Sequence, residues 1–468
     1  MTFICLILLI FIISSWTSFE TELIVPILFS AISLVAMTFS SIQRISLTIP
    51  LIYSVTIICV IFYLVRIVLK RNTININNHL IIYMASILVL CIFYVLVNIF
   101  MCDDSAMFEL TEYSKVSYVI NNHKNQPLLS VIDSSGFRIL DAWEFIIADS
   151  VRMLGNWGIL LAKNIFLISM FLPLVSFCEN CKATDYRFKR IAEIVVVVLI
   201  MISSTENELF TIKPYYINGL MFGGALVYAL RCIETHEIIY ALGSSILAIA
   251  GCLENRVGIY SMIAFIMTCC VIIALSFCCH FFRKMIEIKG KQARSLLMLF
   301  CGMAASVIIG ALYAYRVVIV GEEPLDKDIF NTFLNALYTS YRYGFGIGPI
   351  KISVVYISII MFAIITSMDK YYIKYYESIT NNRFIVNILR YTLFIWFILV
   401  IMIVGGMYTL FWGRENANSF GEYLTSFENY IQCPVTVMLY FYGALSIRAL
   451  ASIRELSFIK KNMKIEQK

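Results

Sequence analysis

Long apolar runs recur along almost the whole sequence, and they constrain the fold more than any other feature. About thirteen such runs lie near residues 2–16, 23–39, 47–68, 80–101, 158–177, 191–203, 216–230, 238–253, 257–279, 296–320, 352–367, 385–407 and 432–450. A helix crosses the hydrocarbon core of a bilayer with about 20 apolar residues. Because the runs are continuous and do not alternate in polarity, they predict helices rather than strands. We therefore expect an all-α polytopic membrane protein with about 13 transmembrane helices.

The composition supports this reading. Of the 468 residues, 60% are hydrophobic and only 14% are charged, whereas soluble domains carry about 25% charged residues. One large soluble core is therefore excluded. The net charge of +6 gives no indication of nucleic-acid binding, because in a membrane protein it mainly reports which loops face the cytoplasm.

The sign of the charge alternates from loop to loop. Loops 69–79, 178–190, 280–295 and 368–384 are basic, whereas loops 102–157, 204–215, 321–351 and 408–431 are neutral or acid-rich. The positive-inside rule places the basic loops in the cytoplasm. We expect N-terminal transmembrane helices in 1–79, a transmembrane module in 80–450 and a basic cytoplasmic tail in 451–468. Loop 102–157 is then extracytoplasmic.

Loop 102–157 is the longest of the predicted outer loops and is rich in acidic residues. Apolar residues recur at helical spacing near 106–121 and near 138–154, and turn-forming residues separate the two stretches. The pattern predicts two amphipathic juxtamembrane helices on the outer surface of the membrane. A lid that only covers the helix bundle is the alternative.

Four short segments resemble motifs of one enzyme group, the bacterial polytopic glycosyltransferases of the GT-C superfamily. Met107–Ser114 resembles their W-D-E-F/L-S/T-H-W-G/A segment, and Tyr215–Gly223 is similar to their Y-x-D-x-L-x-x-x-x-G segment. Leu253–Gly258 resembles the L-x-K/R-x-x-G turn, shifted by about one residue, and Leu424–Tyr430 the L-x-S-F-x-R-Y segment. The segments occur in the family's order and span roughly residues 80–450. The resemblance implies a GT-C-like module in a bacterial cytoplasmic membrane.

The segments also depart from the family pattern. Phe108, Glu112, Asn218 and Asn429 stand where the family has Asp, His, Asp and Arg, while Glu109 keeps the family's acid. Either Glu109 and Glu112 carry the chemistry or the chain is a non-catalytic relative.

The resemblance implies inverting transfer of a hexosyl or pentosyl group from a polyprenyl-phosphate donor to a glycan or lipid acceptor. Such a step needs a general base near the acceptor hydroxyl. Glu109, Glu112 and Asp104 are the candidate catalytic residues. A divalent cation, Mg²⁺ or Mn²⁺, is a candidate cofactor, with Asp103 and Glu109 as its ligands.

The departing lipid phosphate needs positive charge beside it. Arg256, Arg316 and Lys163 lie near the outer ends of predicted spans and are the candidate phosphate contacts. Snorkelling of these cations to lipid headgroups is the alternative reading. Candidate contacts to donor or acceptor are Asn218, Arg342 and Arg414.

Two other functions stay open from the sequence: a surface-polysaccharide polymerase, and a transporter or flippase of lipid-linked glycans. The first is expected to have Arg-rich outer loops, and the second charges in mid-span cavities. The sequence has no Walker A loop and only 4 His, which argues against an ATP-driven pump and a histidine metal site. Finally, Gly344, Gly346 and Gly348 predict a loose chain before the run at 352–367.

Overall fold

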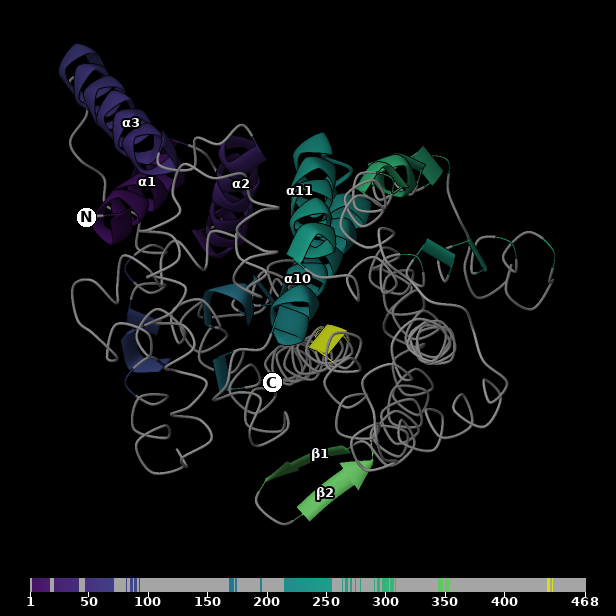
Figure 1. The fold of residues 1–468 in the computed structure, drawn as a ribbon. Helices are drawn as coiled ribbons and strands as arrows, with labels where there is room; N and C mark the ends of the chain where they lie inside the picture. The colour runs from purple at the N-terminus through teal and green to yellow at the C-terminus, as the bar shows by residue number, and fades with distance from the viewer. Residues whose placement is uncertain are drawn as a thin grey trace, which may run out of the picture. The chain divides into compact units, whose positions relative to one another are not determined.

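The computed structural model describes residues 2–16, 21–41, 47–70, 214–254, 344–347 and 350–353, together with single residues and short stretches within 81–92, 168–174, 194–195, 263–308 and 436–440 (Figure 1). The chain forms two compact units. The first comprises Met1–Ser176 and Phe210–Ile212, and the second Phe177–Leu209 and Lys213–Lys468.

The first unit contains three apolar helices, α1 (Thr2–Trp16), α2 (Thr21–Ser41) and α3 (Thr48–Lys70). They coincide with the first three predicted runs. Pro50 lies in the first turn of α3, where a backbone N–H has no partner within the helix and proline is well tolerated. The structure therefore confirms helices at these three apolar runs, whereas the division at residue 79 stays a prediction.

Aromatic side chains join the C-terminal parts of α1 and α3. The rings of Phe11 and Tyr63 meet edge to face, with centroids 5.9 Å apart and an interplanar angle of 82°. Trp16 approaches the same Tyr63 ring at 6.4 Å. Edge-to-face pairs place the positive edge of one ring on the negative face of the other, so Tyr63 fixes how α3 is rotated against α1.

One described helix is long and apolar enough to cross a membrane. It covers Thr48–Leu69 of α3, with 22 residues and a mean hydropathy of 2.4. The other apolar stretches among the described residues, such as Ile4–Trp16 and Ile238–Cys252, are shorter. Thirteen spans and their orientation stay predictions.

The second unit contains a helical hairpin made by α10 (Pro214–Thr235) and α11 (Ile238–Glu254), called the α10–α11 hairpin below. Two residues connect the helices. His236 adopts a left-handed backbone with φ of 61°, and its N–H donates to the Cys232 carbonyl at 2.8 Å. This bond is the αL form of a helix C-cap. It turns the chain within two residues, so the two helices lie side by side.

A short antiparallel β-hairpin corrects one prediction. β1 (Gly344–Ile347) pairs with β2 (Ile350–Ser353), with Ile347 opposite Ile350 and Gly344 opposite Ser353. The expectation of a loose chain at Gly344 and Gly346 was wrong, because glycine amides and carbonyls pair across strands like those of any residue. The run predicted at 352–367 also begins in this strand. Apart from the β-hairpin and the turn at His236 and Glu237, the described residues are helical.

The left-handed conformation of His236 provides a stability test. This backbone costs a residue with a Cβ roughly 1–2 kcal/mol, whereas glycine adopts it freely. Replacing His236 by Gly and by Ala removes the same imidazole, so the difference between the variants isolates the backbone. We expect His236→Gly to unfold at a higher temperature than His236→Ala, by about 1 kcal/mol in unfolding free energy. Equal melting temperatures of the two purified variants in one detergent would contradict the assigned turn.

Candidate functional site

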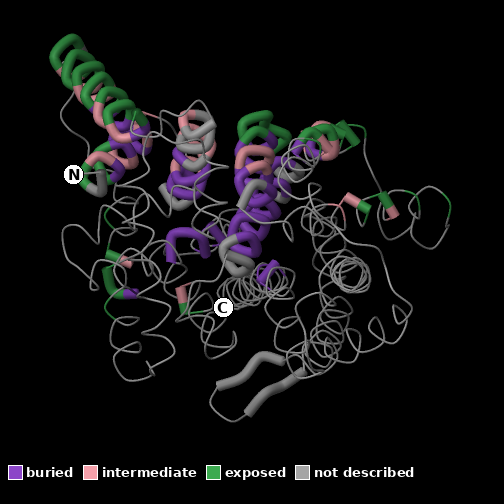
Figure 2. Tube along the Cα trace, in the orientation of Figure 1, coloured by how far each residue is buried: buried purple, intermediate pink, exposed green. Residues whose placement is uncertain are grey.

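The middle of helix α10 is buried around its whole circumference. Every residue from Asn218 to Ala229 is buried, including Tyr228 with 0% exposure, and Figure 2 shows this helix as a nearly continuous buried segment. A helix that is apolar around its whole circumference belongs in the interior of a bundle or a membrane protein. Within its own unit, α10 is therefore a central element that several segments contact.

Asn218 is the polar residue nearest the start of this buried stretch. Its exposed fraction is 0%, and it lies one turn after Pro214, the first residue of α10. A buried amide is tolerated only when its polar atoms are hydrogen bonded. The side chain therefore holds a fixed position near the start of α10.

The register of the α10–α11 hairpin follows from contacts between the helices. The Ser244 hydroxyl donates to the Ala225 carbonyl at 2.8 Å, and both groups are buried. Farther along α11, a Cβ built on Gly251 would lie 3.2 Å from Cζ of Phe222. Residues later in α11 thus lie beside residues earlier in α10. By this register, Asn218 is level with the last turn of α11, which ends at Glu254.

A distant part of the chain packs on the same half of α10. The Tyr440 ring lies directly over Gly223, so that a Cβ at Gly223 would collide with the ring. Tyr440, Thr436 and Val437 are all buried, and this segment lies beside the lower part of α10 in Figure 1. Gly223 is therefore required for close packing, as glycine often is where helices approach closely.

Helix α11 makes a similar close contact with a third segment. The Ser306 hydroxyl donates to the Gly302 carbonyl at 2.8 Å and lies 3.4 Å from the Ser245 carbonyl. A Cβ on Gly302 would collide with the Ser245 hydroxyl. Small residues thus bring residues 302–306 against α11, so the α10–α11 hairpin is enclosed from at least two directions.

Of the predicted site residues, the structure describes Asn218. The others lie outside the described residues: Asp103, Asp104, Glu109, Glu112, Lys163, Arg256, Arg316, Arg342 and Arg414. Within the described part of the chain, no group of three or more His, Cys, Asp or Glu side chains could hold a metal ion. The catalytic, phosphate-binding and metal-binding assignments therefore stay predictions.

Arg231 is a buried cation that the sequence reading missed. Its exposed fraction is 4%, and its guanidinium carbon lies 5.9 Å from the centre of the Tyr240 ring. The run predicted at 216–230 ended one residue before it, whereas α10 continues to Thr235. Cys232 and Ile233, which continue the apolar pattern past Arg231, were the signal that the helix extends. Arg231 and Tyr240 join the two helices near their turn, at the end opposite Asn218.

Comparisons with known proteins add no further information about the site. No family model, no curated protein and no solved structure matches the chain. The family resemblance therefore rests on the four sequence segments alone.

The contact at Gly223 can be tested by packing. Gly223→Ala should destabilise the protein by about 1–3 kcal/mol, because the new methyl group forces the Tyr440 ring to move. Gly290→Ala is a matched control, since nothing lies within 4 Å of its Cβ position. There, alanine should be neutral or stabilising by roughly 0.5–1 kcal/mol. The unfolding temperatures of both variants are measured in detergent. Equal changes in stability would contradict the contact between Gly223 and Tyr440.

A double-mutant cycle tests the Arg231–Tyr240 pair. Single Arg231→Met and Tyr240→Leu substitutions and their combination separate this pair from all other contacts of either residue. We expect a favourable coupling of about 0.5–2 kcal/mol in unfolding free energy, the range for exposed to buried cation–π pairs. Additive single effects would show that the two side chains do not interact.

Proposed function

We propose that the chain is a multi-pass membrane glycosyltransferase of GT-C type. In this proposal it transfers a sugar from a polyprenyl-phosphate-linked donor to a glycan or lipid acceptor of the cell envelope, at the outer face of the membrane. One observation carries the proposal more than any other. The α10–α11 hairpin brings the start of α10 level with the end of α11, and two of the four family-like segments contain these positions.

The meeting of the two segments is specific. Tyr215–Gly223 opens α10, and Leu253–Gly258 begins with the last two residues of α11. Their separation along the chain is bridged by the two-residue turn at His236. The packing of Tyr440 on Gly223 adds a third segment to this half of α10, and Leu424–Tyr430 precedes that segment by a few residues. The arrangement supports a common site for the two family-like segments of the hairpin.

Asn218 has a positioning role in this proposal. With 0% exposure, its amide is enclosed by protein and braces the end of the hairpin. Arg256 follows Glu254 by two residues, and a chain reaches at most about 3.6 Å per residue. In this proposal the Arg256 guanidinium binds the donor phosphate through two parallel hydrogen bonds. Arg316 and Lys163 are further phosphate contacts, and Arg342 and Arg414 contact donor or acceptor.

Loop 102–157 supplies the base. Glu109 removes the proton from the acceptor hydroxyl as the hydroxyl attacks the sugar carbon, and the lipid phosphate leaves with the bonding electrons. Glu112 is three residues away and shares a face with Glu109 on a helix, with Asp104 as a further candidate base. Asp103 and Glu109 are the candidate ligands of a divalent cation, Mg²⁺ or Mn²⁺, which would supply positive charge at the phosphate.

The topology completes the proposal. Basic loops face the cytoplasm together with the C-terminal tail, and the membrane is the cytoplasmic membrane of a bacterium. In the predicted topology, loop 102–157 and loop 204–215, which precedes α10, are both extracytoplasmic. Membrane lipids surround the spans, and the lipid-linked donor reaches the site from the bilayer.

A transfer assay with purified protein tests the function. Full-length chain in nanodiscs is mixed with polyprenyl-phosphate sugars and envelope acceptor extracts, and release of polyprenyl phosphate is measured. Glu109→Gln should lower the rate by about 100-fold or more, because the amide cannot accept the proton. Glu144→Gln changes another acid of the same loop and should leave the rate unchanged.

Different outcomes separate the alternatives. Normal transfer by Glu109→Gln would reject the active-site assignment but keep the function. Absence of transfer by the unaltered chain, with movement of intact lipid-linked glycan across the bilayer, would indicate a flippase. Products that lengthen by whole repeat units would indicate a polymerase.

A further inference from the structure

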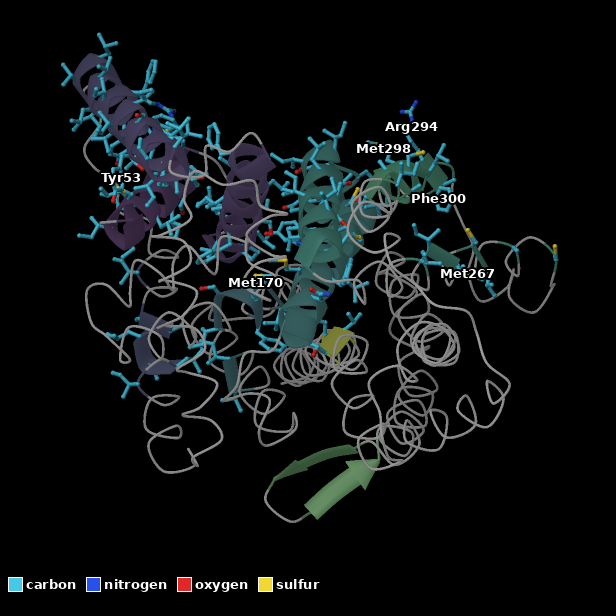
Figure 3. The ribbon with its side chains drawn as sticks, viewed as in Figure 1. Tyr53, Met170, Met267, Arg294, Met298 and Phe300 are labelled. Carbon is cyan, nitrogen blue, oxygen red and sulfur yellow. The ribbon has the colours of Figure 1, made fainter. Side chains whose placement is uncertain are left out.

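Helix α3 has an inverted distribution of polarity. Its buried residues repeat at one-turn spacing and include two threonines, Thr48 at 0%, Ile52 at 5% and Thr56 at 3% exposure. Its exposed side chains are mainly large and apolar, and side chains project all around the helix in Figure 3. The large apolar ones are Leu51, Val55, Ile57, Ile58, Ile61, Phe62, Leu64, Val65, Val68 and Leu69. Pro50, Ser54 and Arg66 are exposed as well. A surface helix in water has the opposite pattern.

We propose that the outward faces of α3 lie directly against lipid acyl chains, and that α3 contacts protein along the stripe through Thr48, Ile52 and Thr56 and at the Tyr63 ring. This inference does not depend on sugar transfer. It states which face of α3 contacts protein, and it names lipid acyl chains as the partner of the exposed faces.

The length and the ends of α3 favour a bilayer as the partner. The apolar stretch has 22 residues, which at 1.5 Å per residue gives roughly 33 Å, close to the roughly 30 Å hydrocarbon core. Arg66 and Lys70 are confined to one end, and Tyr63 and Trp16 meet near that end. Aromatic and basic residues gather where hydrocarbon gives way to headgroups.

The side chains on the outward faces argue against a protein partner. Helices that pair within membranes use small residues for close approach and polar side chains for hydrogen bonds. Besides Ser54 and Arg66, the outward faces carry mainly Ile, Val, Leu and Phe, whereas Thr48 and Thr56 lie in the buried stripe. Thr56 satisfies its hydroxyl within the helix, donating to the Ile52 carbonyl at 2.7 Å. The outward faces therefore match fluid acyl chains better than a second helix.

Neighbouring residues Phe62 and Tyr63 provide a matched test. Phe62 is 62% exposed, whereas the Tyr63 ring contacts Phe11 and Trp16. The photocrosslinker p-benzoylphenylalanine is introduced at each position of the full chain in phosphatidylcholine nanodiscs, and products are identified by mass spectrometry. We expect a phosphatidylcholine adduct at position 62, in several-fold excess over position 63. Position 63 should crosslink to the α1 peptide.

Two results would overturn the proposal. One is a crosslink from position 62 to a second copy of the chain or to another part of the same chain. The other is an equal lipid yield at both positions. Ile58, 52% exposed, repeats the outward test with the same expected adduct, so the proposal stays testable when the Tyr63 variant does not assemble.

Discussion

Close approach of helices at glycine is the constraint on which the second unit depends. Gly223 admits the Tyr440 ring, Gly251 admits Phe222, and Gly302 admits Ser245. Helices in an apolar chain gain little from burying apolar surface against one another when lipid is the alternative, so packing and interhelical hydrogen bonds must hold them. The hydrogen bond from the Ser244 hydroxyl to the Ala225 carbonyl is one such interhelical hydrogen bond. With both in place, residues 218–229 of α10 are buried on all sides, whereas α3 packs along one narrow stripe.

The sequence predicted the helices well where the structure describes them. Apolar runs at 2–16, 23–39, 47–68, 216–230 and 238–253 correspond to α1, α2, α3, α10 and α11, because a helix satisfies its own backbone hydrogen bonds and needs no information from distant residues. The ends were less accurate. Arg231 fell outside the run predicted near 216–230, whereas α10 continues to Thr235 and the turn begins at His236.

Contacts between residues far apart in the sequence could not be predicted from local patterns. Nothing in the local pattern around Gly223 indicates that Tyr440 packs on it, and the glycines at 344 and 346 gave no sign that their backbone pairs with 351 and 353. Long-range pairing depends on the whole fold rather than on a short window of sequence. Of the candidate site, Asn218 is the residue whose setting the structure describes, and its complete burial was not foreseen.

This burial helps to explain why Asn218 stands where the GT-C motif that Tyr215–Gly223 resembles has an aspartate. An ionised carboxylate with 0% exposure needs a compensating charge or several hydrogen bonds, and removing it from water costs several kcal/mol. A neutral amide needs only hydrogen bonds and can both donate and accept them. In a structural role at the start of α10, a buried asparagine therefore costs less free energy than a buried aspartate. The carboxylate that acts as general base in the proposed transfer then has to come from another segment. Loop 102–157 is rich in acidic residues. In the proposed function, Asn218 is therefore a structural residue of the α10–α11 hairpin, and the general base is Glu109.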